Sequence, residues 1–369
     1  MRSSSGKEKI LLVSYSAYPL FQSKNQAVHG GAEVDMYNIA SHLDQKKFDI
    51  HFIVGNFGQP RKERVDGITI HAAQKVHNAS AFSGITNAFA LFILIRKINP
   101  DVILAKSLGW LTVELIIIKI LLRKKLVFRS SHRKNIDGSA DTKPYGKAFR
   151  ILIKHIDHFL IQNKEDEQIL IKNYSFKGPI THIPNLHPIK NIQVERFTER
   201  KHFLWIGRSE LIKNPGAYLE IAKSLPNESF QMILTETDKA VYEDTVTKAM
   251  RIPNISIINK MPHLEVLEYF SYARYFITTS FGEGFPNVLI ESFSKGTPVL
   301  SLYIDFDHMI TKEKVGFVGD GSIQSIVAFI KSIDESNWET LSNNAYNLAK
   351  NNFEIHNRIQ SYEKIFLQI

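Results

Sequence analysis

The chain has 369 residues, a net charge of +9 and no cysteine. This length suffices for two domains that each bury a hydrophobic core, and the lack of cysteine excludes disulfide bridges, thiolate zinc sites and cysteine nucleophiles. It also fits a reducing cytoplasmic compartment. Residues 1–20 lack the pattern of a signal peptide and no stretch reaches the roughly 18 apolar residues of a membrane span, so we expect neither.

Short aliphatic runs alternate with helical patterns in the first half of the chain. The runs predict strands at 8–14, 48–54, 67–73, 101–105, 125–130 and 157–162. Periodic apolar positions predict helices at 31–44 and 84–98. Alternation of this kind indicates an α/β domain with a mainly parallel, doubly wound sheet.

Positive charge is concentrated in this half. Residues 1–184 contain 27 Lys and Arg against 15 Asp and Glu, whereas the remainder contains 19 against 22. The densest basic segment, 119–134, carries no acid and overlaps an aliphatic helix pattern at 111–122. Apolar and basic residues together favour contact of 111–134 with an anionic membrane, at about 1 kcal/mol per basic residue. A buried crossover helix with a solvated basic end explains the same pattern.

The alternation restarts in the second half. Residues 183–200 contain two prolines and little periodicity, which predicts an interdomain linker. Strands are then predicted at 202–206, 229–234, 254–258, 275–279 and 298–302. Helices are predicted at 214–224, 239–249, 264–271, 321–332, 336–351 and 354–367. We therefore expect an N-terminal domain over 1–184 and a C-terminal domain over 185–353.

Two glutamates, Glu283 and Glu291, stand eight positions apart across a glycine-bearing turn and the helix that follows it. The helix is predicted to start near Pro286, which places Glu291 about one and a half turns into it. Both acids can then face one cleft, an arrangement that suits an elongated polar ligand. The first-turn amides of Asn287 and Val288 favour a phosphate or a sugar hydroxyl.

Two further motifs lie upstream of this pair. Residues 205–214 read Trp-Ile-Gly-Arg-Ser-Glu-Leu-Ile-Lys-Asn, and residues 29–33 read His-Gly-Gly-Ala-Glu. With the E-x7-E segment, these motifs resemble those of the retaining glycosyltransferases of family four, in the family's order and through most of the chain. The resemblance implies the GT-B fold, in which two Rossmann-like domains face an interdomain cleft. The helix at 354–367 is then expected to cross back to the first domain, although its periodicity alone also allows packing in the second.

The resemblance implies a role for each matched residue in the second half. Arg208 and Lys213 would hold the diphosphate of the donor, their fixed charges standing in place of a divalent metal, so we expect no metal or other cofactor. Two exposed basic residues at a helix start are the alternative. Glu283 would contact hydroxyls of the donor sugar, and Glu291 would bind the ribose.

Three residues of the first half also belong to the candidate site. His132 ends the strand at 125–130 and matches a family position that touches the donor sugar, while an ordinary surface histidine is the alternative. Gly30 and Gly31 follow the first strand, where backbone amides can approach a phosphate, while a simple turn is the alternative. The fingerprint G-x-G-x-x-G is absent, which argues against an NAD enzyme.

The chain departs from the family pattern in two places. Residues 234–238, Leu-Thr-Glu-Thr-Asp, replace a Gly-Asp-Gly turn, which bears on nucleotide recognition. Lys106 and Ser107 replace a histidine, which bears on recognition of the sugar or the acceptor. We expect base contacts from the backbone at 259–261, at the end of a predicted strand.

The resemblance therefore implies a retaining, metal-independent transfer of a sugar from a nucleotide sugar, such as a UDP- or GDP-sugar, to a lipid-linked or polysaccharide acceptor. The basic first half suits a phosphate-bearing acceptor at the cytoplasmic face of a membrane. A phosphorylase or a nucleotide-sugar epimerase of the same fold is an alternative. A nucleic-acid-binding protein is an alternative from another class, but no binding motif is present and the second half is acidic, so no nucleic-acid partner is expected.

Overall fold

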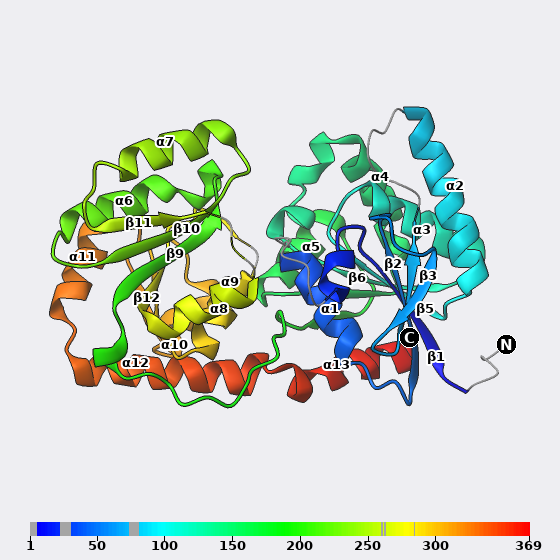
Figure 1. The fold of residues 1–369 in the computed structure, drawn as a ribbon. Coiled ribbons are helices and arrows are strands. Elements are labelled where there is room, and N and C mark those ends of the chain that lie inside the picture. Colours follow the sequence, from blue (N-terminus) through cyan, green and yellow to red (C-terminus); the bar gives the residue numbers. More distant parts are fainter. Residues whose placement is uncertain (1–5, 23–30, 74–80, 260, 262, 284) are drawn as a thin grey trace. The chain divides into compact units, whose positions relative to one another are not determined.

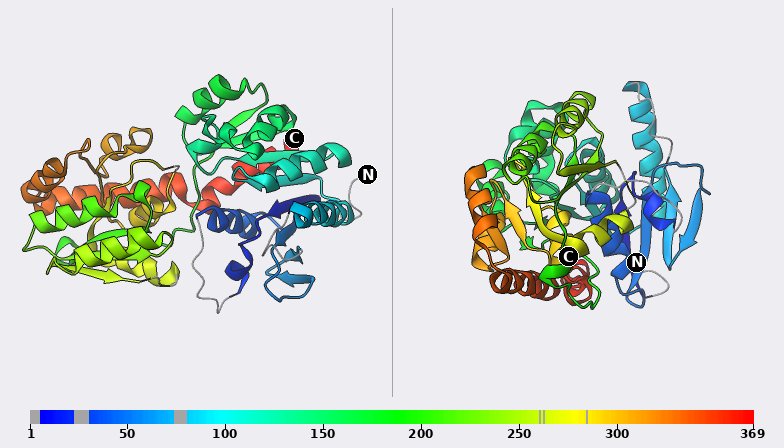
Figure 2. Two further views of the ribbon diagram at one scale, coloured as in Figure 1. Left: turned by 90° about the horizontal axis from the view of Figure 1, so that it is seen from above. Right: turned by 60° about the vertical axis from the view of Figure 1, so that its left-hand side comes forward.

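The computed structural model describes residues 6–22, 31–73, 81–259, 261, 263–283 and 285–369. The chain divides into two compact units (Figure 1). The first contains the described residues up to Pro188 together with Ile355–Ile369, and the second contains Ile189–Glu354. Each unit has a sheet covered by helices on both faces (Figure 2). None of the described helices has both the length and the apolar character needed to cross a bilayer.

The first unit is built on an eight-stranded sheet in the order β3-β4-β2-β1-β5-β6-β7-β8. Neighbouring strands are parallel except β3 and β4. Its central strands are buried aliphatic runs, as a parallel sheet covered on both faces requires. The strands are β1 (Glu8–Val13), β2 (Phe48–Val54), β3 (Lys62–Val65), β4 (Ile68–Ala72), β5 (Val102–Lys106), β6 (Lys125–Arg129), β7 (His158–Ile161) and β8 (Ile180–His182).

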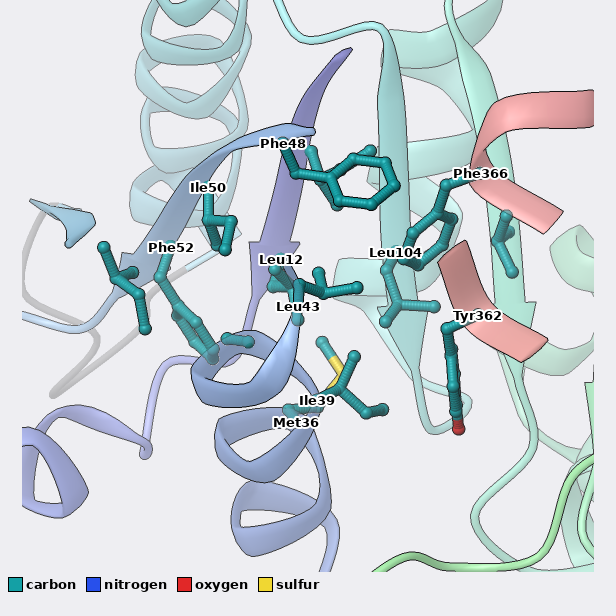
Figure 3. Close-up of a cluster of buried hydrophobic side chains, with 14 of the residues drawn as sticks. Leu12, Met36, Ile39, Leu43, Phe48, Ile50, Phe52, Leu104, Tyr362 and Phe366 are labelled. Carbon is teal, nitrogen blue, oxygen red and sulfur yellow. The ribbon is translucent and has the colours of Figure 1, made fainter. Parts of the chain in front are cut away.

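Helices from distant parts of the chain cover the two faces of this sheet. One face is covered by α1 (Gly31–His42) and α13 (Ile355–Gln368), and Figure 3 shows Met36 and Ile39 of α1 and Tyr362 and Phe366 of α13 around Leu12. The other face is covered by α2 (Ala81–Ile98), α3 (Trp110–Leu122), α4 (Pro144–Leu152) and α5 (Glu165–Tyr174). The apolar side of α13 thus completes the core of the first unit.

The second unit has a six-stranded, fully parallel sheet in the order β11-β10-β9-β12-β13-β14. The strands are β9 (His202–Arg208), β10 (Phe230–Thr235), β11 (Ile255–Ile258), β12 (Ala273–Thr278), β13 (Val299–Ser301) and β14 (Gly316–Val318). One face packs against α6 (Pro215–Ser224), α7 (Lys239–Ala249) and α11 (Ile323–Ser332). The other packs against α8 (His263–Tyr272), α9 (Asn287–Ser294) and α10 (Met309–Lys312), and α12 (Glu335–Leu348) contributes to both.

The predicted strands and helices are confirmed to within a few residues, several with identical bounds, such as β2 and α7. The sequence does not predict β3, β8, β14, α4, α5 or α10. The aliphatic segment 111–122 forms α3, which connects the parallel neighbours β5 and β6, so it is a crossover helix.

The chain passes between the units inside the predicted linker, residues 183–200, but both ends of this segment are anchored in a core. Ile183 and Leu186 are buried in the core of the first unit. Arg200 is 1% exposed, and its guanidinium donates to Thr297 Oγ1 at 2.7 Å and to five backbone carbonyls, among them those of Phe270 and Ala273 at 2.9 and 3.1 Å. The chain passes from the first unit to the second at Pro188–Ile189.

Candidate active site

The strand order of the second sheet reverses between β9 and β12. From β9 the chain proceeds outward through β10 and β11, and it then returns to β12 on the other side of β9. β9 continues through a 3₁₀ turn, η6 (Leu211–Lys213), into α6, and the segment after β12 leads into α9. In open α/β sheets, ligands bind at the carboxyl ends of the strands where the order reverses.

Lys213 and Glu283 meet at this switch point. The Lys213 ammonium contacts Glu283 Oε1 directly, and Ser280 Oγ donates to the same oxygen at 2.9 Å. Thr279 Oγ1 donates to the backbone carbonyl of Lys213 at 2.9 Å, and the Phe281 amide donates to the backbone carbonyl of Ile212 at 2.9 Å. The two loops are therefore joined through both backbone and side chains, and the ion pair retains some exposure, 18% for the lysine and 13% for the glutamate.

Arg208 ends β9 but does not contact this pair. Its guanidinium lies 3.2 Å from Glu210 Oε1, and its side chain is 59% exposed. The next residue, Ser209, accepts hydrogen bonds through its hydroxyl from the amides of Thr237 and Asp238 at 2.9 and 3.1 Å. The segment that replaces the Gly-Asp-Gly turn is thereby held against the end of β9.

The second glutamate lies in a different environment from the first. Pro286 precedes α9, so Asn287 and Val288 supply the first-turn amides of that helix. Glu291 follows on the same helix and is only 3% exposed, inside the second unit. The two acids thus differ in access to ligands, since Glu283 lies at the surface of the switch point and Glu291 is buried.

The remaining candidate residues belong to the first unit or lie outside the described residues. Gly31 begins α1. His132 precedes the short 3₁₀ turn η2 (Arg133–Asn135), and its Nδ1 accepts a hydrogen bond from the Lys134 amide at 3.1 Å. Gly30 and Lys260 lie outside the described residues. The structure therefore divides the predicted site residues between the two units, with Arg208, Lys213, Glu283, Asn287, Val288 and Glu291 in the second.

A buried charge network in the first unit is missing from the sequence prediction. Asp35 Oδ2 accepts from Lys106 Nζ at 2.5 Å and from Arg129 Nε at 2.6 Å, and Arg129 also donates to Asn185 Oδ1 at 2.8 Å. The side chains of Asp35 and Arg129 are fully buried and that of Lys106 is 3% exposed. Lys106, which stands where the family has a histidine, is thus a buried partner of Asp35.

Burial and mutual attraction act in opposite directions on the pKa values of this network. Burial alone would raise the pKa of Asp35, but the charges of Arg129 and Lys106 hold it below its usual range. Burial lowers the pKa of Lys106 to about 8 despite the attraction of Asp35. In the sequence, the members of this network are visible only as charged residues that end the apolar strands β5 and β6 and as an acid in the apolar part of α1. The sequence does not show that they contact one another.

Ser280, Thr279 and Glu210 are also missing from the sequence prediction, although each lies close to a motif residue. Ser280 donates to Glu283, and Thr279 donates to the backbone of Lys213. Glu210 forms an ion pair with Arg208. No cluster of three or more His, Asp or Glu side chains with the geometry of a metal site occurs among the described residues. Among the described residues of the two loops at the switch point, Lys213 and Arg208 carry the positive charges.

Comparison with known proteins places this geometry in a family. Residues 29–187 match Glycosyltransferase Family 4, and residues 189–352 match Glycosyl transferases group 1. An uncharacterized glycosyltransferase of Methanocaldococcus jannaschii is 20% identical over 247 residues, and the match spans 60% of this chain and 60% of the length of that relative.

Solved structures with low sequence identity share the fold along the whole chain. Sucrose-phosphate synthase from Thermosynechococcus elongatus has a TM-score of 0.78 at 14% identity, with 98% of this chain and 99% of that chain covered. Trehalose-6-phosphate synthase OtsA has a TM-score of 0.76 at 12% identity, with 98% and 99% covered. Anabaena HepE, in complex with UDP-glucose, has a TM-score of 0.72 at 14% identity, with 98% and 100% covered.

These likenesses confirm the predicted GT-B fold of two α/β domains with parallel sheets. The two family matches meet between residues 187 and 189, next to the boundary between the two units. The chain therefore belongs to the GT-B glycosyltransferases, with a first half of family four and a second half of group 1.

Proposed function

We propose that this chain transfers a sugar from a nucleotide diphosphate sugar, such as a UDP- or GDP-sugar, to a lipid-linked or polysaccharide acceptor. The observation that carries the proposal is the contact of Lys213 with Glu283 at the switch point of the second sheet. Two similar structures support this class of donor, because HepE was determined with UDP-glucose and a trehalose-6-phosphate protein of E. coli with UDP-2-fluoro glucose.

The ion pair suits the charge that develops during transfer. Breaking the bond between the anomeric carbon and the phosphate oxygen builds positive charge on the sugar and negative charge on the departing diphosphate. An ammonium group has three donors, so Lys213 can hold Glu283 with one and direct the others to the diphosphate. Because the pair is already formed, the cation is in place before the donor binds, and Arg208 adds a second positive charge nearby. In this proposal these two side chains replace a divalent metal.

In the proposed reaction the incoming and leaving groups share one face of the sugar. The anomeric carbon loses its bond to the diphosphate oxygen and forms a bond to the acceptor oxygen, and the acceptor proton passes to the leaving phosphate oxygen. Glu283, held by Lys213 and Ser280, orients the sugar hydroxyls and forms no covalent bond. The roles that the resemblance implies for His132 and Gly31, contact with the donor sugar and with phosphate, are part of this proposal.

The charge of the first half of the chain indicates the class of acceptor. The excess of Lys and Arg in residues 1–184 suits an acceptor that carries phosphate. We place the reaction at the cytoplasmic face of a membrane, with residues 111–134 in contact with anionic lipid.

A panel of UDP- and GDP-sugars tests the proposal. One donor should raise the melting temperature of the protein and be slowly hydrolysed without acceptor, and both effects should persist in EDTA. Once an acceptor is found, NMR of the product should show the anomeric configuration of the donor. The proposal fails if no nucleotide sugar stabilises the protein, and loss of hydrolysis in EDTA would contradict its metal-independent form.

A further inference from the structure

Three neighbouring helices of the first unit expose large apolar side chains on their outer surfaces. These are Phe89 and Ile93 on α2, Trp110, Ile117 and Leu121 on α3, and Ile151 on α4, and we call the surface that they form the docking face. The exposed fractions reach 65% for Phe89, 65% for Leu121 and 68% for Ile151. Side chains of this size are not needed on the solvent side of a crossover helix.

On α2 and α3, the helical spacing places the exposed apolar residues on one side of each helix, and on α3 the acid Glu114 lies between Trp110 and Ile117 in the same row. Trp110, Ile117 and Leu121 are separated by seven and four residues, so they lie on one side of α3. The opposite side of α3, including Leu115 and Ile118, is buried against the sheet. The helix therefore has large apolar side chains on its exposed side as well as on its buried side, and its charged residues are Glu114 and Lys119.

Several contacts hold α3 and α4 next to each other. Lys119 of α3 donates to the backbone carbonyl of His155, just after α4, at 2.7 Å and to Asp157 at 2.6 Å. At the start of both helices, the rings of Trp110 and Tyr145 pack edge to face at 6.4 Å, and the Lys143 ammonium lies 5.8 Å from the centre of the Tyr145 ring. Aromatic rings beside a lysine are typical of the boundary between lipid and water.

Basic residues surround the exposed apolar side chains. Residues 86–98, 110–125 and 143–154 contain ten Lys and Arg and one acid, Glu114. Lys147, one helical turn before Ile151 on α4, and Lys154, in the 3₁₀ turn η4 (Ile153–His155) that follows α4, are exposed, and neither forms an ion pair with a described residue. Long basic side chains at the edge of an apolar surface reach phosphate headgroups while their methylene stems stay on the apolar side.

We propose that the docking face binds the surface of an anionic lipid bilayer through inserted apolar side chains and basic contacts to lipid phosphates. The inference rests on the proposed function, since it specifies how the enzyme reaches a lipid-linked acceptor. It widens the contact from residues 111–134 to exposed apolar side chains on α2, α3 and α4. A second copy of this chain fits less well, because pairing two such faces would oppose two sets of like charges.

Vesicle sedimentation of the full-length chain tests the proposal. The protein should bind phosphatidylcholine vesicles that contain phosphatidylglycerol, bind pure phosphatidylcholine weakly, and dissociate as salt is added. The double variant Ile117→Glu with Leu121→Glu should reduce the partition coefficient at least about tenfold, because it removes the inserted side chains. The triple variant Lys143→Gln, Lys147→Gln and Lys154→Gln should reduce it by about fivefold per lysine.

The matched control is Met250→Glu, an apolar-to-acid change at a residue 81% exposed in the second unit, which should bind vesicles as the unchanged protein does. Equal binding by the double variant, or no binding of the unchanged protein to anionic vesicles, would overturn the proposal. So would a dimer of the unchanged protein that Ile117→Glu with Leu121→Glu converts to monomer. Stabilisation by a nucleotide sugar, measured in every variant, reports on the proposed function separately: its absence from the unchanged protein counts against the activity and not against the docking face.

Discussion

Lys213 and Glu283 illustrate how two residues 70 positions apart can act as one group. Lys213 lies five residues after the end of β9 and Glu283 five residues after the end of β12, and the loops that carry them are joined by backbone and hydroxyl contacts. The cation is held by the acid on one side and is accessible on the other. In the proposed reaction, removal of either partner leaves the other both misplaced and uncompensated.

Replacement of either partner should therefore lower turnover strongly, and the effects should not add. We expect Lys213→Met and Glu283→Gln each to reduce kcat by about 100-fold or more, the usual cost of removing one electrostatic contact to a transition state. The double variant should be little worse than the poorer single variant, because the two side chains act as a unit. Steady-state kinetics of donor hydrolysis measure all three.

Glu220→Gln is the control for this series, since Glu220 forms an exposed ion pair with Lys223 on α6, away from the switch point. Its kinetics should equal those of the unchanged enzyme. Fully multiplicative losses in the double variant would show that Lys213 and Glu283 act independently, and the proposed arrangement would then be wrong.

Asp35 holds a second group of residues together by charge, in this case inside a core. Asp35→Asn should lower the free energy of unfolding by about 3–5 kcal/mol, because the cations of Arg129 and Lys106 would then be buried without a counter-charge. Urea denaturation measures this loss. Asp244→Asn, at an exposed pair with Lys248, should change stability by no more than about 0.5 kcal/mol. Equal effects of the two variants would show that the network does not stabilise the unit.

The sequence could indicate the first of these groups but not the second. Glu283 and Lys213 lie in motifs that end predicted strands, and parallel strands bring their carboxyl ends to one edge of the sheet. Asp35 lies 71 residues from Lys106 and 94 from Arg129, and nothing in the local pattern of α1 specifies which cations it meets. Likewise, the spacing of Glu291 places it on α9, but only the packing of the helix shows that it is buried.

At the scale of elements, the sheet of the first unit contains a buried histidine pair on β2 and β4. His51 Nδ1 and His71 Nε2 are 2.8 Å apart, and His51 Nε2 lies 3.1 Å from Asp49. One imidazole must donate and the other accept, so both cannot be protonated while the contact persists. Burial lowers the pKa of His71 to about 4, assisted by His51 and by Lys62 and Lys97, while Asp49 opposes the shift. Burial also lowers the pKa of His51.

This pair should make the protein sensitive to acid below neutral pH. The folded state binds protons more weakly than the unfolded chain, whose histidines titrate near 6.5, so stability falls as the pH drops from about 6.5 towards about 4. His71→Val should reduce that loss between pH 7 and pH 5 by on the order of 1 kcal/mol, whatever its effect at pH 7. Urea denaturation at both pH values measures the difference. The exposed His155→Gln is the control, and an identical pH dependence for His71→Val would show that the pair does not titrate as argued.

The strands that the sequence predicts best are buried on both faces, so most of their residues are apolar. β1, β2, β9 and β10 are apolar runs covered on both faces, so composition alone identifies them. β3 is a short charged edge strand, and β8 and β14 have three residues each, so their apolar content is too small to register. The helix α5 begins with three acids, a favourable first turn, but its apolar stripe is weak.

At the scale of the whole molecule, the first unit is discontinuous in sequence. All strands of its sheet precede Pro188 in the chain. Of the described α-helices before Pro188, only α1 packs on one face of this sheet, and it covers that face in part. The last helix, α13, supplies the rest, and the Ile355 amide donates to the His187 carbonyl at 3.1 Å as the chain re-enters the unit. The second unit, in contrast, is formed by one continuous stretch of the described chain, Ile189–Glu354.

A chain ending at Glu354 should therefore lose the first unit and keep the second. It would lack five apolar side chains buried in the first core, Ile355, Ile359, Tyr362, Ile365 and Phe366. At about 1.5–3 kcal/mol for each buried side chain, their loss amounts to roughly 10 kcal/mol as an upper estimate, comparable to the whole stability of a domain. Hydrogen exchange should show protected amides in β9–β13 and rapid exchange in β1–β7, while a nucleotide sugar still slows exchange at the switch point. Leu367→Glu, at an α13 residue that is 53% exposed, is the matched control and should leave both units protected. Protection of β1–β7 in the shortened chain would show that the first core is stable without α13, and the division of the chain into these two units would then not describe how it folds.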